Sequence, residues 1–399
     1  MKAIIFGAGK IARGFIAHLL DRSKASIVFV DVSEPLIGLM RQRGRYSIHI
    51  MGAEHLDADI AGFDSLLLGD AAAVADQWAD ADVAFASVGG KNIPALGQTI
   101  AESFRLRCDR ASWERPFNII TCENWKEPAR LLAQHIRMNL PPEYTALFDR
   151  WVGVTEAVVM RSAVEPAADM LERDPLCVCV SNYWELPVDV SRIMGEPPAI
   201  EGVKYIGEFS GFLERKFYTY NAANGTTSYL GYLRGHRYIY DAASDPEIVG
   251  VLDRVYQETS LALARKHGVE LEEQLAFAAS SRRKLQDRSI VDYVERNARD
   301  PIRKLGPDDR LVGSARLVES SGIEPEALSV AIAAAIHYDH PDDPIAQQLR
   351  RMRETEGVDA VLRQVCMIAP EEPLARLVKE KIDWLARQGW LASREGMAQ

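Results

Sequence analysis

The chain has 399 residues, of which 47% are hydrophobic and 26% are charged, values typical of a folded globular protein with two or three domains at roughly 100 to 200 residues each. Acidic residues (57) outnumber lysines and arginines (47), and the net charge of −10 argues against nonspecific binding to nucleic acid or to an anionic membrane. The first apolar stretch is too short for a signal peptide, and no apolar run approaches the roughly 18 residues of a membrane span. We therefore expect a cytoplasmic protein.

The cysteines and histidines predict neither a disulfide framework nor a metal site. An odd number of cysteines, 5 in this chain, fits reduced thiols in a reducing compartment. Cys177 and Cys179 alternate with valines, which favours two small residues on one face of a strand over zinc ligands. A zinc site needs further Cys or His at ligand spacing, and residues 136–235 contain no histidine.

The first 125 or so residues predict alternating strands and helices. Short apolar runs predict strands at residues 3–6, 26–30, 82–88 and 118–122, and residues 10–21 have the apolar spacing of a helix. Strands separated by helices form βαβ units with a parallel sheet, and unbroken apolar runs suit a sheet covered on both faces.

The second half has a different pattern. Residues 151–194 still favour strands, notably 152–159 and 176–180, and a break follows where Pro197 and Pro198 are adjacent. Beyond about residue 210, apolar residues recur at helical spacing over residues 246–267, 324–337 and 373–390. We predict an α/β domain over residues 1–200 and a mostly α-helical domain that provides the substrate and catalytic residues over residues 201–399.

A glycine-rich segment follows the first predicted strand. Residues 7–12 read GAGKIA and match G-x-G-x-x-A, in which Gly7 makes a tight turn, Gly9 allows the backbone to approach a pyrophosphate, and Ala12 packs the helix on the strand. Asp31 ends the second strand, roughly 20 residues further on, where an acidic side chain binds ribose hydroxyls. Since Asp31 would repel a 2′-phosphate, the sequence predicts a Rossmann-type, doubly wound domain that binds NAD rather than NADP.

Two cations stand at the start of the helix that follows this segment. Lys10 and Arg13 would lie in its first turn, where positive charge is unfavourable unless an anion is bound. They are expected either to face a bound pyrophosphate or to point to solvent.

The residue types restrict the dehydrogenase chemistry. None of the 13 tyrosines is followed four residues later by lysine, as a short-chain dehydrogenase requires, and the zinc ligands and a histidine base are missing from the expected regions. The remaining candidate base is a lysine. At about 100° per residue, Asn224 lies about 80° from Lys216 and about 60° from Asn221 around a helix, so all three can face one site. A buried polar helix with no catalytic role is the alternative on these grounds.

Several segments together resemble the polyol-specific long-chain dehydrogenases. They are residues 6–15, 122–124, 213–231 and 294–305 followed by 309–311, and they occur in the family's order over nearly the whole chain. The resemblance implies that Lys216 is a metal-independent general base and that Asn221 polarises the reacting oxygen, with Asn224 also catalytic. It places Val88, Gly89 and Asn124 on the nicotinamide side. The residues of the first half expected to bind the cofactor are Gly7, Gly9, Lys10, Ile11, Ala12, Asp31, Val88, Gly89 and Asn124.

The chain departs from the family pattern at three polar positions. Asn224 replaces a histidine, Glu156 occupies the place of a site acid or amide, and Met160 replaces an aspartate. An amide can hydrogen-bond a hydroxyl but cannot carry a proton near neutral pH. We expect Glu156 to bind substrate.

A basic segment in the second half resembles the branch of the family that acts on phosphorylated polyols. Guanidinium and ammonium groups suit phosphate oxygens, and Arg310 lies nearby in the sequence. A solvated basic face is the alternative. The residues assigned to phosphate are Arg299, Arg303 and Lys304.

The sequence therefore favours an NAD-dependent oxidoreductase that interconverts a hexitol phosphate and its ketose. One alternative is a member of the same family that acts on another polyol, a uronate or an amino-sugar derivative. Another is an NAD-binding protein that has lost turnover.

Overall fold

The computed structural model describes residues 1–110 and 113–391, and the chain divides into two compact units, Met1–Phe209 and Ser210–Gln399. The division falls after the proline-rich break at residues 197 and 198. The reason is that β12 (Val203–Ile206) pairs in parallel with β11 (Leu186–Asp189), which keeps this stretch in the first unit.

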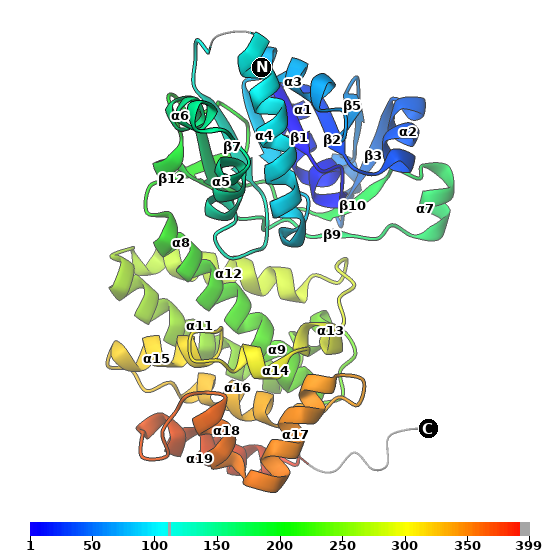
Figure 1. Cartoon of the computed structure of the whole chain (residues 1–399). Helices are drawn as coiled ribbons and strands as arrows, with labels where there is room; N and C mark the ends of the chain where they lie inside the picture. Colours follow the sequence, from blue (N-terminus) through cyan, green and yellow to red (C-terminus); the bar gives the residue numbers. More distant parts are fainter. Residues whose placement is uncertain (111–112, 392–399) are drawn as a thin grey trace. The chain divides into compact units, whose positions relative to one another are not determined.

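A six-stranded parallel sheet forms the centre of the first unit (Figure 1), in the order β5-β2-β1-β6-β7-β8. Its strands are β1 (Lys2–Phe6), β2 (Ser26–Asp31), β5 (Asp64–Leu67), β6 (Val83–Ala86), β7 (Phe117–Thr121) and β8 (Val152–Glu156). The predicted parallel sheet and its first strands are confirmed. Because the chain continues from β1 to β2 on one side and later to β6 on the other, the carboxyl ends of β1 and β6 meet where the strand order reverses, the usual ligand site of such sheets.

Helices cover both faces of this sheet, as the unbroken apolar strands predict. Ile4 and Phe6 of β1 pack with the core under α3, α4 and α5, whereas Ala3 and Ile5 pack with α1 and α2. Alternate residues of the strand thus serve opposite cores. The helical segments are η1 (Ala12–Ile16), α1 (Ala17–Arg22), α2 (Glu34–Arg43), η2 (Glu54–Leu56), α3 (Ala71–Asp80), η3 (Gly90–Asn92), α4 (Ile93–Arg110), α5 (Pro128–Met138), α6 (Pro142–Trp151), α7 (Ala168–Arg173) and η4 (Val190–Arg192).

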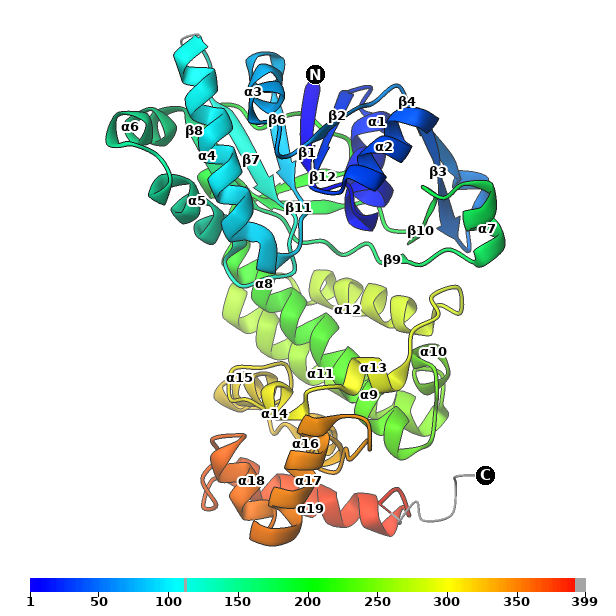
Figure 2. The same cartoon turned by 45° about the vertical axis from the view of Figure 1, so that its right-hand side comes forward.

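A second, four-stranded sheet was only partly expected from the sequence (Figure 2). Its order is β4-β3-β10-β9, with β3 (Arg45–Met51), β4 (Ala58–Ala61), β9 (Ala163–Val164) and β10 (Val178–Ser181). The residues of β3 alternate between buried and less buried positions, and its parallel partner β10 comes from a distant part of the chain. Cys177 and Cys179, beside and within β10, are buried free thiols.

The second unit is helical, as predicted, and three of its helices match the predicted ranges closely. These are α11 (Pro246–His267), α16 (Glu326–Ile336) and α19 (Pro373–Arg387). The remaining segments are α8 (Phe209–Lys216), which starts one residue before the division, η5 (Phe217–Asn221), α9 (Ala222–Leu233), α10 (Ile239–Ala242), α12 (Leu271–Gln286), α13 (Val294–Ala298), α14 (Pro301–Lys304), α15 (Val312–Ser320), α17 (Pro344–Glu356) and α18 (Val358–Gln364).

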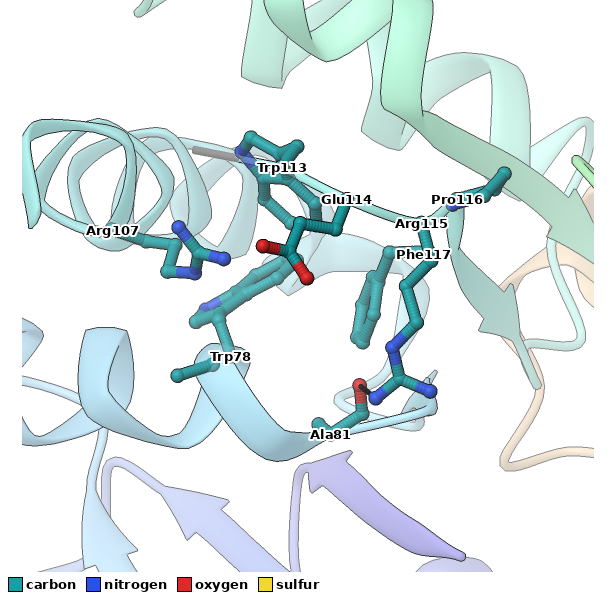
Figure 3. Close-up of a pocket in the computed structure, with 9 residues that line it drawn as sticks. Trp78, Ala81, Arg107, Trp113, Glu114, Arg115, Pro116 and Phe117 are labelled. Carbon is teal, nitrogen blue, oxygen red and sulfur yellow. Dashed lines mark hydrogen bonds between the residues drawn. The ribbon is translucent and has the colours of Figure 1, made fainter. Parts of the chain in front are cut away.

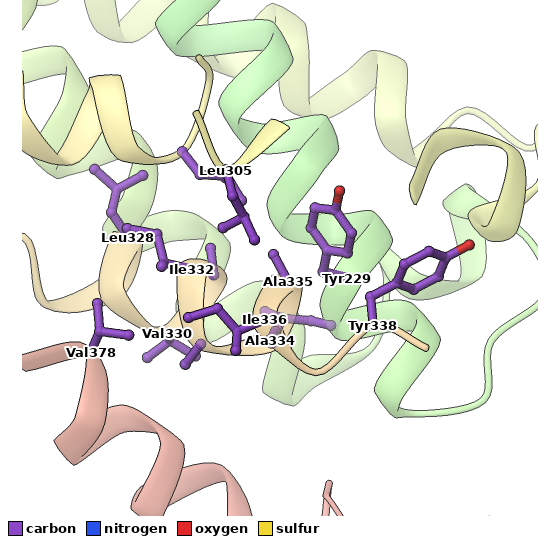
Figure 4. Packing of buried hydrophobic residues seen from close by; sticks show 14 of the residues in the cluster. Tyr229, Leu305, Leu328, Val330, Ile332, Ala334, Ala335, Ile336, Tyr338 and Val378 are labelled. Atoms are coloured by element: carbon purple, nitrogen blue, oxygen red, sulfur yellow. The ribbon is translucent and has the colours of Figure 1, made fainter. Parts of the chain in front are cut away.

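The centre of the helical unit is α16, whose residues after Glu326 are all buried. A helix that is apolar on every side must lie inside a core, and α16 packs against α9, α11 and α19. Figure 4 shows this packing around Ile332 and Ile336. The buried Glu258 of α11 accepts hydrogen bonds from the amides of Ala327 and Leu328 at 2.7 and 3.2 Å, which satisfies the start of α16.

None of the helices within residues 1–110 and 113–391 is long and apolar enough to cross a membrane.

Candidate active site

The turn after β1 has the geometry that the glycine motif predicts. Gly7 has φ +92°, and a Cβ there would lie 2.2 Å from the carbonyl oxygen of Ser87, at the end of β6. Only glycine permits this conformation and this approach. By contrast, a Cβ on Gly9 would have no heavy atom within 4 Å, so the space above Gly9 is open to a ligand. The turn therefore fits an approaching pyrophosphate at the start of a helix.

Asp31 ties this turn to the end of β2. Its Oδ2 accepts a hydrogen bond from the Ala8 amide at 2.6 Å, and its Oδ1 accepts one from the Ser33 amide at 2.9 Å. A carboxylate oxygen can accept more than one hydrogen bond, so Asp31 keeps acceptor capacity for ribose hydroxyls. Its role in cofactor binding stays a prediction.

Of the two cations near the turn, Arg13 departs from the expectation, and the cofactor role of Lys10 stays a prediction. Arg13 points into the fold: it is buried, and its guanidinium donates to the carbonyl oxygens of Ala8 and, at 3.2 Å, Leu176. Burial lowers the pKa of Arg13. Lys10 forms an ion pair with Glu165. Arg13 therefore supports the turn from inside the fold, a contact that local sequence does not indicate because it does not show that the first helical turn is buried.

The helix that follows the turn contains an unexpected π-helical segment, η1. Ile11 precedes it and is half-buried, Ala12 within it is fully buried, and the Ala17 amide donates to the Ala12 carbonyl, five residues earlier. A Cβ on Gly14 would lie 2.6 Å from the Val180 side chain. The small residues thus allow close packing of this segment against the neighbouring sheet.

Glu123, after β7, holds the loop that follows β6. Its Oε1 accepts hydrogen bonds from the amides of Val88 and Gly89 at 2.6 and 2.9 Å. Burial raises the pKa of Glu123, although these two hydrogen bonds favour the ionised form. Asn124, the next residue, is exposed. The family resemblance assigns no role to Glu123, and the structure shows that this residue shapes the loop expected to face the nicotinamide.

Glu156 lies at the carboxyl end of β8 and is buried. Burial raises the pKa of its carboxyl, and the Arg192 guanidinium lies 3.8 Å away. Met160, which accepts a hydrogen bond from Tyr183 through its sulfur at 3.3 Å, is also buried. The substrate role assigned to Glu156 stays a prediction.

In the helical unit, Lys216 ends α8 in a half-buried position. Among the residues that the structure describes, its ammonium group has no hydrogen-bond or ion-pair partner. Burial and the nearby charge of Arg310 lower the pKa of Lys216 to about 8. Lys284 of α12 is near enough to Lys216 for their charges to interact. Burial, together with the charge of Lys216, lowers the pKa of Lys284 to about 8. Lys216 is therefore able to exchange a proton close to neutral pH.

The asparagines expected beside Lys216 have different surroundings. Asn224 donates a hydrogen bond from Nδ2 to Oδ1 of Asn297 at 3.2 Å, and the Asn297 carbonyl accepts one from Lys304. The Asn221 side chain has no protein hydrogen-bond partner within the described part of the chain. Asn297, from α13, thus joins Asn224 to the buried Lys304, a link that residue spacing alone could not predict.

The basic residues assigned to phosphate differ in burial. Lys304 is 6% exposed, and burial together with Arg310 and Arg303 lowers its pKa to about 7. Arg303 is exposed and is bound to Asp300 at 2.7 Å and to Asp309 at 3.3 Å, and Arg299 is exposed. Arg310 lies over the ring of Phe217, with 5.5 Å between Cζ and the ring centroid, and donates to Asp309.

A pocket of about 250 Å³ lies elsewhere in the first unit (Figure 3), lined by Trp78, Arg107, Trp113, Arg115 and their neighbours. Its residues Ala81 and Phe117 lie at the amino ends of β6 and β7, whereas the Gly7 turn follows the carboxyl end of β1. The pocket is therefore separate from the candidate cofactor site. Within the described residues, no group of three or more His, Cys, Asp or Glu is placed to hold a metal ion.

Both units match models of known protein domains. The family model of the mannitol dehydrogenase Rossmann domain matches residues 1–202, and that of the mannitol dehydrogenase C-terminal domain matches residues 208–383. The chain is 33% identical over 381 residues to mannitol-1-phosphate 5-dehydrogenase of Brevibacillus brevis, covering 96% of this chain and 97% of that protein. It is 34% identical over 382 residues to the Bacillus licheniformis protein of the same name, covering 95% and 98%.

Two solved structures share the fold at low sequence identity. Substrate-free D-sorbitol dehydrogenase has a TM-score of 0.76 at 15% identity, covering 98% of this chain and 93% of that one. Mannitol 2-dehydrogenase of Pseudomonas fluorescens, solved with NAD and D-mannitol, has a TM-score of 0.69 at 15% identity, covering 98% and 92%. With family models matched over both units, the chain belongs to the mannitol dehydrogenase family.

Proposed function

We propose that this protein is an NAD-dependent oxidoreductase that interconverts a hexitol phosphate and the corresponding ketose phosphate. The observation that carries the chemistry is Lys216, a half-buried lysine with no acidic partner in the described residues and a pKa of about 8. A general base works best when its pKa lies near the working pH. The names of the relatives, mannitol-1-phosphate 5-dehydrogenase, support the phosphorylated substrate.

The first unit offers the residues that would hold the cofactor. Gly7 and Gly9 leave room for the pyrophosphate, Asp31 has acceptor oxygens for the ribose, and Glu123 fixes the loop at Val88 and Gly89. NAD, when bound, supplies the hydride acceptor for oxidation of the alcohol.

In the helical unit, Lys216 and Asn221 would act on the reacting hydroxyl. Lys216 Nζ takes the hydroxyl proton as the alcohol carbon loses its hydride, and the carbon–oxygen single bond becomes a carbonyl. The Asn221 amide donates a hydrogen bond to that oxygen, which stabilises negative charge as it develops. In ketose reduction the lysine returns the proton.

Lys304, with Arg299 and Arg303 as outer cations, would hold the phosphate. Lys304 and Arg310 are both largely shielded from solvent, so an anion there gains more electrostatic stabilisation than it would from exposed charges.

We also propose a cytoplasmic location, supported by five free cysteines, which are usual in a reducing compartment.

A screen of NAD reduction with polyols, polyol phosphates, uronates and amino-sugar derivatives tests this function. We expect the highest kcat/KM with a hexitol phosphate such as mannitol 1-phosphate. Preference for a uronate, an amino-sugar derivative or a free polyol would instead indicate a family member with a different substrate. NADH binding without turnover on any compound would indicate a protein that has lost activity.

A further inference from the structure

The helix that carries Lys216 changes its winding immediately after this residue. The segment Phe217–Asn221 is π-helical, and the Ala222 amide donates to the Phe217 carbonyl, five residues earlier. On an α-helix, Lys216 and Asn221 would be about 140° apart around the axis. In a π turn, with hydrogen bonds that span five residues, they lie one turn apart on the same face. The uniform helical spacing assumed from the sequence is therefore wrong at this point.

One buried side chain bridges both sides of Lys216. Gln274 of α12 is fully buried. Its Oε1 accepts a hydrogen bond from Arg215 Nε at 2.8 Å, and its Nε2 donates one to Oγ1 of Thr219 at 2.9 Å. Arg215 directly precedes Lys216, and Thr219 lies in the middle of the π turn. The amide thus fixes the segment that contains the lysine at two points.

These contacts supply the tertiary support that a π turn needs. Such turns are rare and occur frequently at functional sites. Thr219 is fully buried, so loss of its partner would leave an unsatisfied hydroxyl away from water, a cost that opposes rearrangement. At the outer edge of the same interface, Arg215 also pairs with Glu273 at 2.7 Å, and Glu273 is 62% exposed in its side chain.

We propose that Gln274 is a positioning residue for the reaction, which holds the π turn so that Lys216 and Asn221 present their side chains to one substrate oxygen. The inference rests on the proposed function, since it assigns Gln274 a part in the same proton transfer. Gln274 touches neither reacting group and acts through Arg215 and Thr219.

The central variant is Gln274→Met, which keeps the side-chain length and removes both hydrogen bonds. We expect kcat for polyol phosphate oxidation to fall about 10- to 100-fold, the loss typical of a small misplacement of catalytic groups. The KM for NAD and the affinity for NADH should stay within about twofold, because the glycine turn lies in the other unit. Thr219→Val removes one of the two bonds and should give a smaller loss in the same direction.

Two further variants separate positioning from general destabilisation. Gln274→Glu can accept hydrogen bonds from both Arg215 and the Thr219 hydroxyl, so it should restore most of kcat. Glu273→Gln weakens only the exposed ion pair and should leave kcat unchanged. A loss of kcat that follows thermal stability across all four variants would overturn the proposal.

A second readout reports on Lys216 without turnover. The pH dependence of its labelling by acetic anhydride, measured by mass spectrometry, gives the midpoint for its deprotonation. The charged groups identified near it are Arg310 and Lys284, and a displaced lysine would leave them for solvent. We expect the midpoint to rise in Gln274→Met and, by less, in Thr219→Val. Gln274→Glu does not serve for this readout, because a carboxylate near Lys216 would itself favour the charged ammonium.

The outcomes distinguish a failure of the positioning role of Gln274 from a failure of the proposed function. If the wild-type protein is active, Lys216→Ala is inactive and Gln274→Met keeps both kcat and the labelling midpoint, the positioning role is wrong and the proposed function stands. If Lys216→Ala remains active, the proposed base itself is wrong.

Discussion

Both units carry their candidate site residues beside a π-helical segment, but they support that segment in different ways. In the first unit, η1 packs through Gly14 against the valines of β10. In the helical unit, Thr219 of η5 accepts a hydrogen bond from the buried Gln274. The first arrangement depends on a small residue that lets side chains of a distant strand approach, whereas the second depends on a hydrogen bond from a side chain of another helix.

The charged groups of the two sites differ in the same way. Asp31 and Glu123 accept hydrogen bonds from backbone amides and fix loops. Burial lowers the pKa values of Lys216, Lys284 and Lys304, and neighbouring cations add to the effect: Arg310 acts on Lys216 and Lys304, and Lys216 acts on Lys284. The candidate cofactor site is therefore built from backbone geometry, and the proposed substrate site from side-chain charges brought together by folding.

Removing the proposed base should give the largest loss of activity and should separate the roles of the two sites most clearly. Lys216→Ala should lower turnover by about 10²- to 10⁴-fold, the usual contribution of general acid–base catalysis. NADH affinity, measured by fluorescence titration, should be nearly unchanged. Lys379→Ala, at an exposed lysine paired with Asp359, is the control and should keep full activity. A parallel loss of NADH binding in Lys216→Ala would mean that the two sites are not separable in this way.

Removing the proposed phosphate cations should have the next largest effect. We expect the double variant Arg303→Ala and Lys304→Ala to raise KM for a polyol phosphate about 10- to 100-fold, since hydrogen bonds to charged groups contribute about 1.5–3 kcal/mol each. KM for the free polyol should change little. Equal changes for the two substrates would assign these residues to a solvated or structural role. Arg303→Ala alone should have the smaller effect, because Arg303 is exposed and already paired.

The cofactor site should discriminate between the two nicotinamide cofactors. NADH is expected to bind at least about tenfold more tightly than NADPH, because Asp31 would repel the 2′-phosphate. Fluorescence titration of both cofactors measures the ratio. Asp31→Asn removes the charge and can keep the hydrogen bond from the Ala8 amide but not also that from Ser33, and it should reduce the discrimination. Equal affinities in the wild-type protein would contradict the cofactor assignment.

The pH dependence of turnover should show the smallest effect. Polyol oxidation needs neutral Lys216, so kcat should rise with pH through about 8, by about threefold between pH 7.5 and 8.5. Ketose reduction needs the protonated lysine and should fall over the same interval. Rates of both reactions across this range provide the measurement. A flat profile where chemistry limits the rate would argue against this lysine as the titrating group.

Much of the fold could be predicted because its signals are local. The short apolar runs of β1, β2, β6 and β7 and the long periodic pattern of α11 identified these elements from a few residues each. The alternating pattern of β3 is also visible in the sequence, but its pairing with β10 joins segments far apart in the chain. Pairing of this kind depends on tertiary packing as much as on local preference.

The site residues show the same difference between local sequence signals and tertiary contacts. Position 7 requires glycine because of its backbone conformation, so the glycine motif could be recognised from the sequence. Lys216 and Asn221 were identified by elimination and resemblance. The burial of Arg13, the loop held by Glu123 and the link through Asn297 involve contacts between separate elements. Gln274 has no sequence signal of its own, because its significance comes entirely from its two partners.

The sequence by itself determined the parallel sheet, the helical second half and the glycine turn, because each follows from local periodicity or backbone conformation. Lys216 was proposed as the base from elimination and from the resemblance to a family. The tertiary structure decided the winding of the helix after Lys216 and the pKa of that lysine. Both depend on what surrounds the residue. Burial beside Arg310 disfavours the charged ammonium, and a hydrogen bond from α12 supports a π turn that local helix preferences do not predict.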